Sequence, residues 1–381
     1  MYSIKNIQSF EKDLTEKGFP WANLTINPDE HIQRFLNYKP KVENSRYKLS
    51  AFRPKCRYYL PPLFHDENVT IGSLKKDISE INNLTDFWTE KVRLSTRKLD
   101  ESQSPLELIE SKETKKGVLA TLQNENPDID QCTEFQVRQV FGFVIHEARN
   151  FKLTWAKGLL SFVGGLDFWK GKRWLDISTG YGDRLLAAAL LEFGYYLGFD
   201  PNSTLIEPLN DMIQYLEKRN PKLEGKLKSV TLPFEDSEII LTKEEPFDLV
   251  FSSPPFFNGE IYSDEKTQSV KRFTSFDGWM KNFFFKSIEI AWKHLKEGGY
   301  LILYVGDPQT VKGSIAEPMN LFIESLDNSN YEGVIGVENH LGIFRPCWVW
   351  SKAKSDCKVR RKLWKPYVKR SLKSNYPELV Y

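Results

Sequence analysis

Trp174-Leu-Asp-Ile-Ser-Thr-Gly-Tyr-Gly-Asp-Arg184 is the stretch that decides the fold, because an apolar strand ending in an acidic residue runs through two glycines into a helix. Gly180 and Gly182 let the backbone turn tightly and approach a ligand, since a Cβ there would collide with it. The third glycine of the dinucleotide fingerprint is missing, because Leu185 stands in its place, and this disfavours NAD or FAD. The carboxylate of Asp176 suits a cationic ligand better than a pyrophosphate.

Short apolar runs alternate with amphipathic segments on both sides of this stretch, the pattern of an α/β fold with a mostly parallel sheet. The expected strands are Arg173–Ile177, Tyr195–Phe199, Leu227–Thr231, Asp248–Phe251, Tyr300–Val305, Gly333–Glu338 and Phe344–Trp350. The expected helices are Asp183–Phe193, Ser203–Lys218 and Phe276–Leu295. Seven strands, the last two close enough for an antiparallel pair, predict a Rossmann-like, doubly wound sheet with ligands at the carboxyl ends of its strands.

Two further strand ends carry side chains suited to a nucleoside. Asp200 ends the second expected strand, where a carboxylate can accept hydrogen bonds from both ribose hydroxyls. Leu232-Pro-Phe-Glu-Asp236 follows the third strand. There Glu235 is the candidate acceptor for an adenine amino group, and Phe234 is the candidate to pack on the ring. The three strand ends together predict a nucleoside-binding edge.

The fourth strand leads into the candidate catalytic residues Ser253, Pro254, Pro255 and Phe256. Two consecutive prolines cannot continue a strand ladder, so they fix the direction of the carbonyl between them. That carbonyl and a neighbouring side-chain oxygen can accept both hydrogens of a planar amino group, which frees its nitrogen lone pair for an incoming methyl. Phe256 supplies a face for the acceptor ring. Such a transfer depends mainly on positioning and predicts no metal site.

From about residue 145 to 355, the chain resembles the Rossmann-like, S-adenosylmethionine-dependent amino-methyltransferases, whose catalytic motif is (Asp/Asn/Ser)-Pro-Pro-(Tyr/Phe). The order of motifs is similar to that of several DNA adenine and cytosine methyltransferase groups. The resemblance implies a class I methyltransferase fold and S-adenosyl-L-methionine as cofactor. It implies that the cofactor-binding residues include Asp176, Ser178, Gly180 and Gly182, and that the acceptor is an adenine N6 or cytosine N4 amine. The base stays open.

By the same resemblance, a segment before the first strand folds over the methionine part of the cofactor. Phe151-Lys-Leu-Thr-Trp-Ala-Lys157 is the candidate, with Thr154 or Trp155 as the contact. A plain amphipathic helix packed on the sheet is the equally weighted alternative.

The polar loop after the catalytic motif is a candidate for substrate recognition, since recognition residues tend to lie on loops. Glu260, Tyr262 and Gln268 are candidate contacts to a base edge or backbone. A base in duplex DNA must swing out of the stack to react, and Phe257 and Tyr262 are then expected to help Phe256 hold it. An ordinary solvated loop is the alternative.

Three parts are expected along the 381 residues: a helical or irregular region over 1–145 that is a candidate for substrate recognition, the methyltransferase domain over 146–355, and a basic tail over 356–381. The tail, and the aromatic and basic stretch Phe52–Tyr59, are candidates for contact with phosphate. The sequence contains no run of about 18 consecutive apolar residues, so it predicts no membrane span. Four scattered cysteines favour an intracellular, reducing location, in the cytoplasm, nucleoid or nucleus.

The leading interpretation is a DNA amino-methyltransferase whose partner is nucleic acid, with no oligomeric state predicted. An RNA or protein-glutamine methyltransferase is the first alternative, because a rigid carbonyl can receive any planar amine or amide. A non-catalytic nucleic-acid-binding subunit with the same fold is the second. Against the latter, both the cofactor motif and the catalytic motif are intact.

Overall fold

The computed structural model describes residues 1–40, 42–45, 71–74, 80–98, 103–306, 314–338 and 344–353. The predicted basic tail over 356–381 and the stretch Phe52–Tyr59 lie outside the described residues. In the part of the chain that is described, no helix is both long and apolar enough to cross a membrane.

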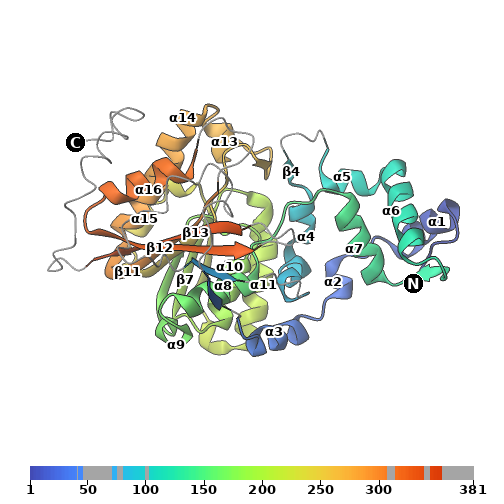
Figure 1. Ribbon diagram of the computed structural model, residues 1–381, viewed down its shortest axis with the longest axis horizontal. Coiled ribbons are helices and arrows are strands. Elements are labelled where there is room, and N and C mark those ends of the chain that lie inside the picture. Colours follow the sequence, from blue (N-terminus) through green and yellow to red (C-terminus); the bar gives the residue numbers. More distant parts are fainter. Residues whose placement is uncertain are drawn as a thin grey trace.

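The central sheet confirms the α/β prediction (Figure 1). Its strands are β2 (Val42–Ser45), β3 (Ile71–Leu74), β6 (Arg173–Asp176), β7 (Tyr195–Asp200), β8 (Leu227–Thr231), β9 (Phe247–Ser252), β11 (Leu295–Tyr304), β12 (Ser329–Glu338) and β13 (Phe344–Lys352). They lie in the order β2-β3-β12-β13-β11-β9-β6-β7-β8. The run from β11 through β9, β6 and β7 to β8 is parallel. β13 is antiparallel to both β11 and β12, which confirms the expected antiparallel pair.

Two short strands of the N-terminal third extend this sheet, although the sequence shows no strand pattern there. β3 pairs in parallel with β12, and β2 pairs antiparallel with β3. Each has four residues, too few for an alternating pattern to stand out, so the exposed edge of β12 rather than local sequence specifies them.

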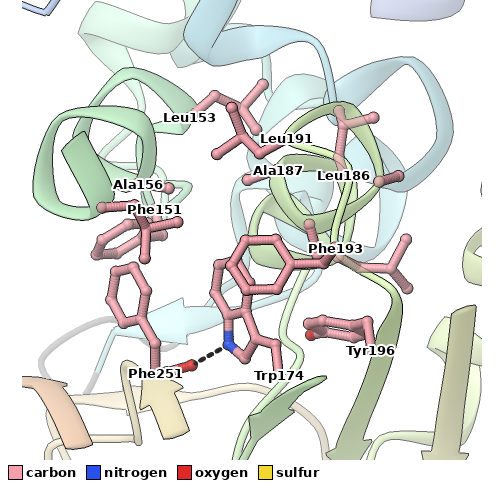
Figure 2. Close-up of a cluster of buried hydrophobic side chains, with 14 of the residues drawn as sticks. Phe151, Leu153, Ala156, Trp174, Leu186, Ala187, Leu191, Phe193, Tyr196 and Phe251 are labelled. Atoms are coloured by element: carbon pink, nitrogen blue, oxygen red, sulfur yellow. Dashed lines mark hydrogen bonds between the residues drawn. The ribbon is translucent and has the colours of Figure 1, made fainter. Parts of the chain in front are cut away.

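Apolar clusters cover the sheet on both faces. One cluster joins β6, β7, β9 and β11 to the π-helix Met280–Phe285, α15 (Lys286–Lys293) and α16 (Ala316–Ser325). The other joins the opposite face to α8 (Leu153–Phe162), α9 (Leu166–Trp169), α10 (Asp183–Leu190) and α11 (Ile206–Arg219). Figure 2 shows the centre of the second cluster, where the ring of Trp174 lies parallel to that of Phe251 at 5.2 Å. The Trp174 indole also donates to the Phe251 carbonyl at 3.0 Å. Alternate side chains of the strands therefore point to opposite faces of the sheet and pack into two separate cores.

The N-terminal region forms a helical body beside the sheet, at the right of Figure 1. It contains α1 (Ile7–Lys17), α2 (Ala22–Thr25), α5 (Pro105–Ile109), α6 (Lys112–Glu125) and α7 (Glu134–Val144), together with the two-stranded pair β1 (Tyr2–Ser3) and β5 (Gln131–Cys132). Its own apolar core includes Phe10, Leu122 and Phe141. In contrast, α3 (Pro28–Asn37) and the 3-10 turn Glu80–Asn83 contribute Ile32, Phe35 and Ile81 to a core of the sheet. The N-terminal third is thus divided between both bodies.

α4 (Asp86–Leu94) packs against both bodies, and a buried ionic network joins it to α7. Arg93 donates to both carboxylate oxygens of Asp86 at 2.7 Å and to Glu147 at 2.7 Å. Glu147 also accepts from Arg138 of α7 at 2.8 Å, and these two arginines hold the pKa of Glu147 down at about 2. A second link is the pairing of β10 (Glu260–Ile261), just after the catalytic motif, with β4 (Arg97–Lys98).

Candidate functional site

One cavity lies along the carboxyl ends of the parallel strands, where a doubly wound sheet binds its ligands. Its lining comes from the ends of β9, β6, β7 and β8, in the order in which these strands lie in the sheet. The predicted residues that line it are Ser178, Gly180, Asp200, Phe234, Glu235, Ser253, Pro255, Tyr262 and Gln268. The fold therefore brings together residues that are up to 90 positions (268 − 178) apart in the sequence.

Asp176 lies beneath the cavity and does not line it. Its fully buried carboxylate accepts from Arg184 Nε at 2.8 Å, Tyr196 Oη at 2.8 Å, Ser252 Oγ at 2.7 Å and the Ser178 amide at 3.2 Å. The sequence pointed to Asp176 as a partner for a cationic ligand. The geometry instead makes it an anchor that links β6 to β7, β9 and α10, with its charge already balanced by Arg184.

The two glycines of the turn have different functions. Gly180 has φ +55°, lines the cavity, and has open space where a Cβ would stand, so its backbone is accessible to a ligand. At Gly182, φ is +90° and a Cβ would lie 2.8 Å from Leu209 Cδ2 and 2.9 Å from Met212 Cε. Gly182 is therefore favoured by its left-handed backbone, lies against the side-chain tips of α11, and does not line the cavity.

Asp200 ends β7 and faces the cavity. Its carboxylate accepts from the amides of Gly180 and Asn202, both at 3.0 Å, which fixes its orientation. Burial raises the pKa of Asp200 to about 6, even though both amide contacts lower it. A half-buried carboxylate held in this way retains lone pairs for a ligand hydroxyl.

The end of β8 gives the cavity an apolar wall and one unsatisfied acceptor. Phe234 is buried and packs edge-on against Phe199, with ring centroids 5.2 Å apart. Glu235 is only 2% exposed, and its Oε1 accepts from Arg272 Nη1 at 2.6 Å. Its Oε2 is buried with no hydrogen-bond partner among the described residues. Because burial raises the pKa of Glu235 and an unpaired buried oxygen is costly, this oxygen is suited to a donor from a ligand.

The catalytic motif follows β9, and its members separate into two groups. Ser253 and Pro255 line the cavity, whereas Pro254 is buried and Phe256 is half-buried with its ring 6.0 Å from that of Tyr304. Phe257 does not reach the cavity. It adopts φ +54° and packs against Phe276 and Trp279 at 5.5 and 5.7 Å, which places it in the apolar core instead of a substrate pocket.

The loop beyond the motif is ordered by the N-terminal region. Glu260 belongs to β10, opposite Lys98, and accepts from the Tyr262 hydroxyl at 2.6 Å. Glu260 does not line the cavity, while Tyr262 does. Glu260 therefore orients Tyr262, and its base-edge contact stays a prediction.

The expected segment before β6 reaches the cavity through its first residue, Phe151, but the expected contact Thr154 does not line it. Thr154 is buried in α8, where its amide and hydroxyl both donate to Asn82 Oδ1 at 3.1 and 2.9 Å. Arg149 and Phe151 line the cavity instead. Arg149 is exposed and forms no ion pair or hydrogen bond with any described residue. The helical pattern of the sequence does not predict this arrangement, because both residues come before the first turn of α8.

Asp183 is a further cavity residue that the sequence reasoning missed. It begins α10, is 3% exposed, and accepts from Thr85 Oγ1 of the N-terminal third at 2.8 Å. Burial raises the pKa of Asp183 to about 7. Within the described ranges, no group of three or more His, Cys, Asp or Glu side chains is arranged to hold a metal ion.

Comparison with known proteins finds similarity only in structure. No protein-family model matches the chain, and no curated protein matches its sequence. Among solved structures, it is similar to an rRNA methylase from Streptococcus thermophilus (12% identity, TM-score 0.33, covering 50% of this chain and 92% of that one). It is also similar to TrmN from Thermus thermophilus (14%, 0.36, covering 53% and 49%). The third is RsmC, a 16S rRNA methyltransferase of T. thermophilus solved with AdoMet and guanosine (18%, 0.33, covering 53% and 43%).

At such identities and scores the likeness carries no argument about activity, so the assignment of the fold rests on the sheet. Five parallel strands are followed by an antiparallel β13 inserted between β11 and β12, with helices on both faces. The chain therefore has the Rossmann-like fold of class I methyltransferases.

Proposed function

We propose that this protein is an S-adenosylmethionine-dependent methyltransferase that modifies an exocyclic amino group of a nucleic-acid base. The observation that carries the proposal is the order in which functional groups lie along one edge of the sheet. Strands β9, β6, β7 and β8 are neighbours in that order, and their ends carry the Ser-Pro-Pro-Phe turn, the glycine turn, the Asp200 carboxylate and the apolar wall of Phe234. This row fits an extended ligand with its reacting group beside Ser253 and its base beside Phe234.

The residues of the cavity fit the adenine, the ribose and the methionine part of this cofactor. Glu235 Oε2, buried and unpaired, is suited to the adenine amino group, and Asp200 is suited to the ribose hydroxyls. Arg149, the unpaired cation at the β6 side, is suited to the methionine carboxylate. When bound, the cofactor supplies a methyl group on a positively charged sulfur.

The catalytic turn acts by positioning the acceptor. Pro254 and Pro255 restrict the backbone, so the carbonyl of Pro254 is fixed to accept one hydrogen of the acceptor amine, and Ser253 Oγ accepts the other. This withdraws the nitrogen lone pair from the ring and directs it at the methyl group. Phe256 and Tyr262 hold the ring of the acceptor between them. Most of the rate enhancement then comes from orientation and pre-paid entropy.

For the acceptor, we place an adenine or cytosine of DNA first, swung out of the duplex to reach the cavity. The same base amine in RNA is the alternative, since neither the turn nor the aromatic residues distinguish the two sugars. The basic sequence over 356–381 supports a polymeric nucleic acid with either sugar.

The test is transfer of labelled methyl from S-adenosylmethionine to duplex DNA, single-stranded DNA and RNA in parallel, followed by digestion and mass analysis of the nucleosides. Methylated adenine or cytosine from DNA is the expected result, and label only in RNA selects the alternative. Ser253→Ala should lower turnover and preserve cofactor affinity, whereas Asp200→Ala should weaken cofactor binding. Cofactor binding without methylation of any nucleic acid would leave a protein-glutamine methyltransferase or a non-catalytic binding subunit.

A further inference from the structure

A short strap, residues 263–272, lies across the ends of β7 and β8 and carries part of the cavity lining. Its Glu265 carboxylate accepts from the Ser203 amide at 3.1 Å, and its Thr267 hydroxyl donates to the Pro201 carbonyl at 3.2 Å. At its other end, Arg272 pairs with Glu235 at 2.6 Å. The strap is therefore fastened to the ribose side and the base side of the proposed cofactor site.

Gln268 lies between these attachments, at the start of α13 (Ser269–Arg272), and lines the cavity. Its side chain is 6% exposed, yet its Nε2 has no hydrogen-bond partner among the described residues. Its backbone N–H donates to the Glu265 carbonyl, and its own carbonyl accepts from the amides of Lys271 and Arg272 at the end of α13. The unpaired amide is thus a buried donor held in place by ordered backbone.

Three buried side-chain atoms of the cavity lining have no partner among the described residues: the donor Gln268 Nε2, the acceptor Glu235 Oε2 and, at the turn after β6, the hydroxyl Thr179 Oγ1. Arg272, four residues further along the strap than Gln268, pairs with Glu235 and so links the strap to the end of β8. Unsatisfied buried polar atoms of opposite kind, lining the same site, are explained by a ligand that offers the complementary pair.

We propose that Gln268 is a specificity-determining residue that reads the base of the cofactor. Its amide donates to N1 of adenine while Glu235 Oε2 accepts from the 6-amino group. The inference rests on the proposed function, because it places the adenine of S-adenosylmethionine at the end of β8. A 6-oxopurine presents the reverse pattern: its oxygen faces the Glu235 carboxylate, and its N1–H faces the Gln268 donor.

The test compares binding of S-adenosylhomocysteine and S-inosylhomocysteine by calorimetry. The wild-type protein should prefer the adenine compound by about 100-fold, since two mismatched buried contacts each cost about tenfold. Gln268→Leu, which removes the donor but keeps an apolar body, should weaken the adenine compound about tenfold. The double variant Glu235→Gln/Gln268→Glu, which exchanges donor and acceptor, should reverse the preference.

Gln139→Glu, the same chemical change on an exposed face of α7, is the matched control and should change neither constant. Thermal melting of every variant separates loss of folding from loss of affinity. Retention of wild-type affinities in Gln268→Leu, with altered acceptor preference in the methylation assay, would overturn the inference and assign Gln268 to the acceptor base. Failure of the wild-type protein to bind either compound would instead overturn the proposed function.

Discussion

Replacing Arg184 with Met tests whether Asp176 is an anchor of the sheet. The pair is almost completely removed from water, with side-chain exposures of 4% for Arg184 and 0% for Asp176. Removing the cation leaves a buried carboxylate with three neutral donors, from Tyr196, Ser252 and Ser178. Breaking one partner of a buried pair costs about 3–5 kcal/mol, and because these donors remain we expect the lower end, about 3 kcal/mol.

Urea unfolding followed by tryptophan fluorescence measures this loss. Arg34→Met is the control, because Arg34 pairs with Glu30 on the surface, at exposures of 47% and 53%, where such pairs contribute about 1 kcal/mol or less. The double variant Asp176→Asn/Arg184→Met should recover part of the stability, since the two residues are coupled. A loss at Arg184 no larger than that of the control would refute the anchoring role of Asp176.

Three other predictions concern single residues. Because burial holds the pKa of Asp183 at about 7, above its unfolded value, the folded state binds the extra proton and stability decreases as pH rises from about 4 to 7. Asp183→Asn should remove this slope of up to about 1.4 kcal/mol per pH unit, which urea titrations at several pH values would detect. Arg149→Ala should weaken S-adenosylhomocysteine about tenfold and leave methylthioadenosine, which has no carboxylate, unaffected; equal losses in calorimetry would contradict a carboxylate contact. Phe257→Ala should cost about 3–5 kcal/mol of folding free energy while cofactor affinity persists, whereas unchanged melting would return Phe257 to the list of substrate contacts.

The sequence predicted the strand ends well because each one is marked locally. An apolar run predicts a strand, and an acidic residue, glycines or two prolines directly after it predict where the strand ends. Asp200, Glu235 and Ser253 reach one cavity because parallel strands bring such ends to one edge. The bounds were less exact: β11 begins at Leu295, five residues before the expected Tyr300.

The sequence could not predict which partner each side chain finds. Thr154 was predicted as a cofactor contact, but its amide and hydroxyl both donate to Asn82, which lies 72 positions earlier in the sequence. Phe257 follows the catalytic motif directly, but its left-handed backbone turns the ring away into the core. Gly182 was attributed to ligand approach, and only the structure shows that it lies against Leu209 and Met212 of α11. All three depend on contacts distant in sequence.

Charge along the cavity argues for an extended ligand with a cation at one end and a neutral base at the other. Asp176 neutralises Arg184, whereas Arg149 and Asp183 line the cavity as separate charged groups. They suit the carboxylate and the ammonium of an amino acid. Asp200 and Asp183 both have raised pKa values because of burial. A pyrophosphate beside them would raise these pKa values further, while a nearby positive charge would lower them. The same buried carboxylates therefore favour a sulfonium or ammonium group, and disfavour a dinucleotide, without any contact from Asp176 itself.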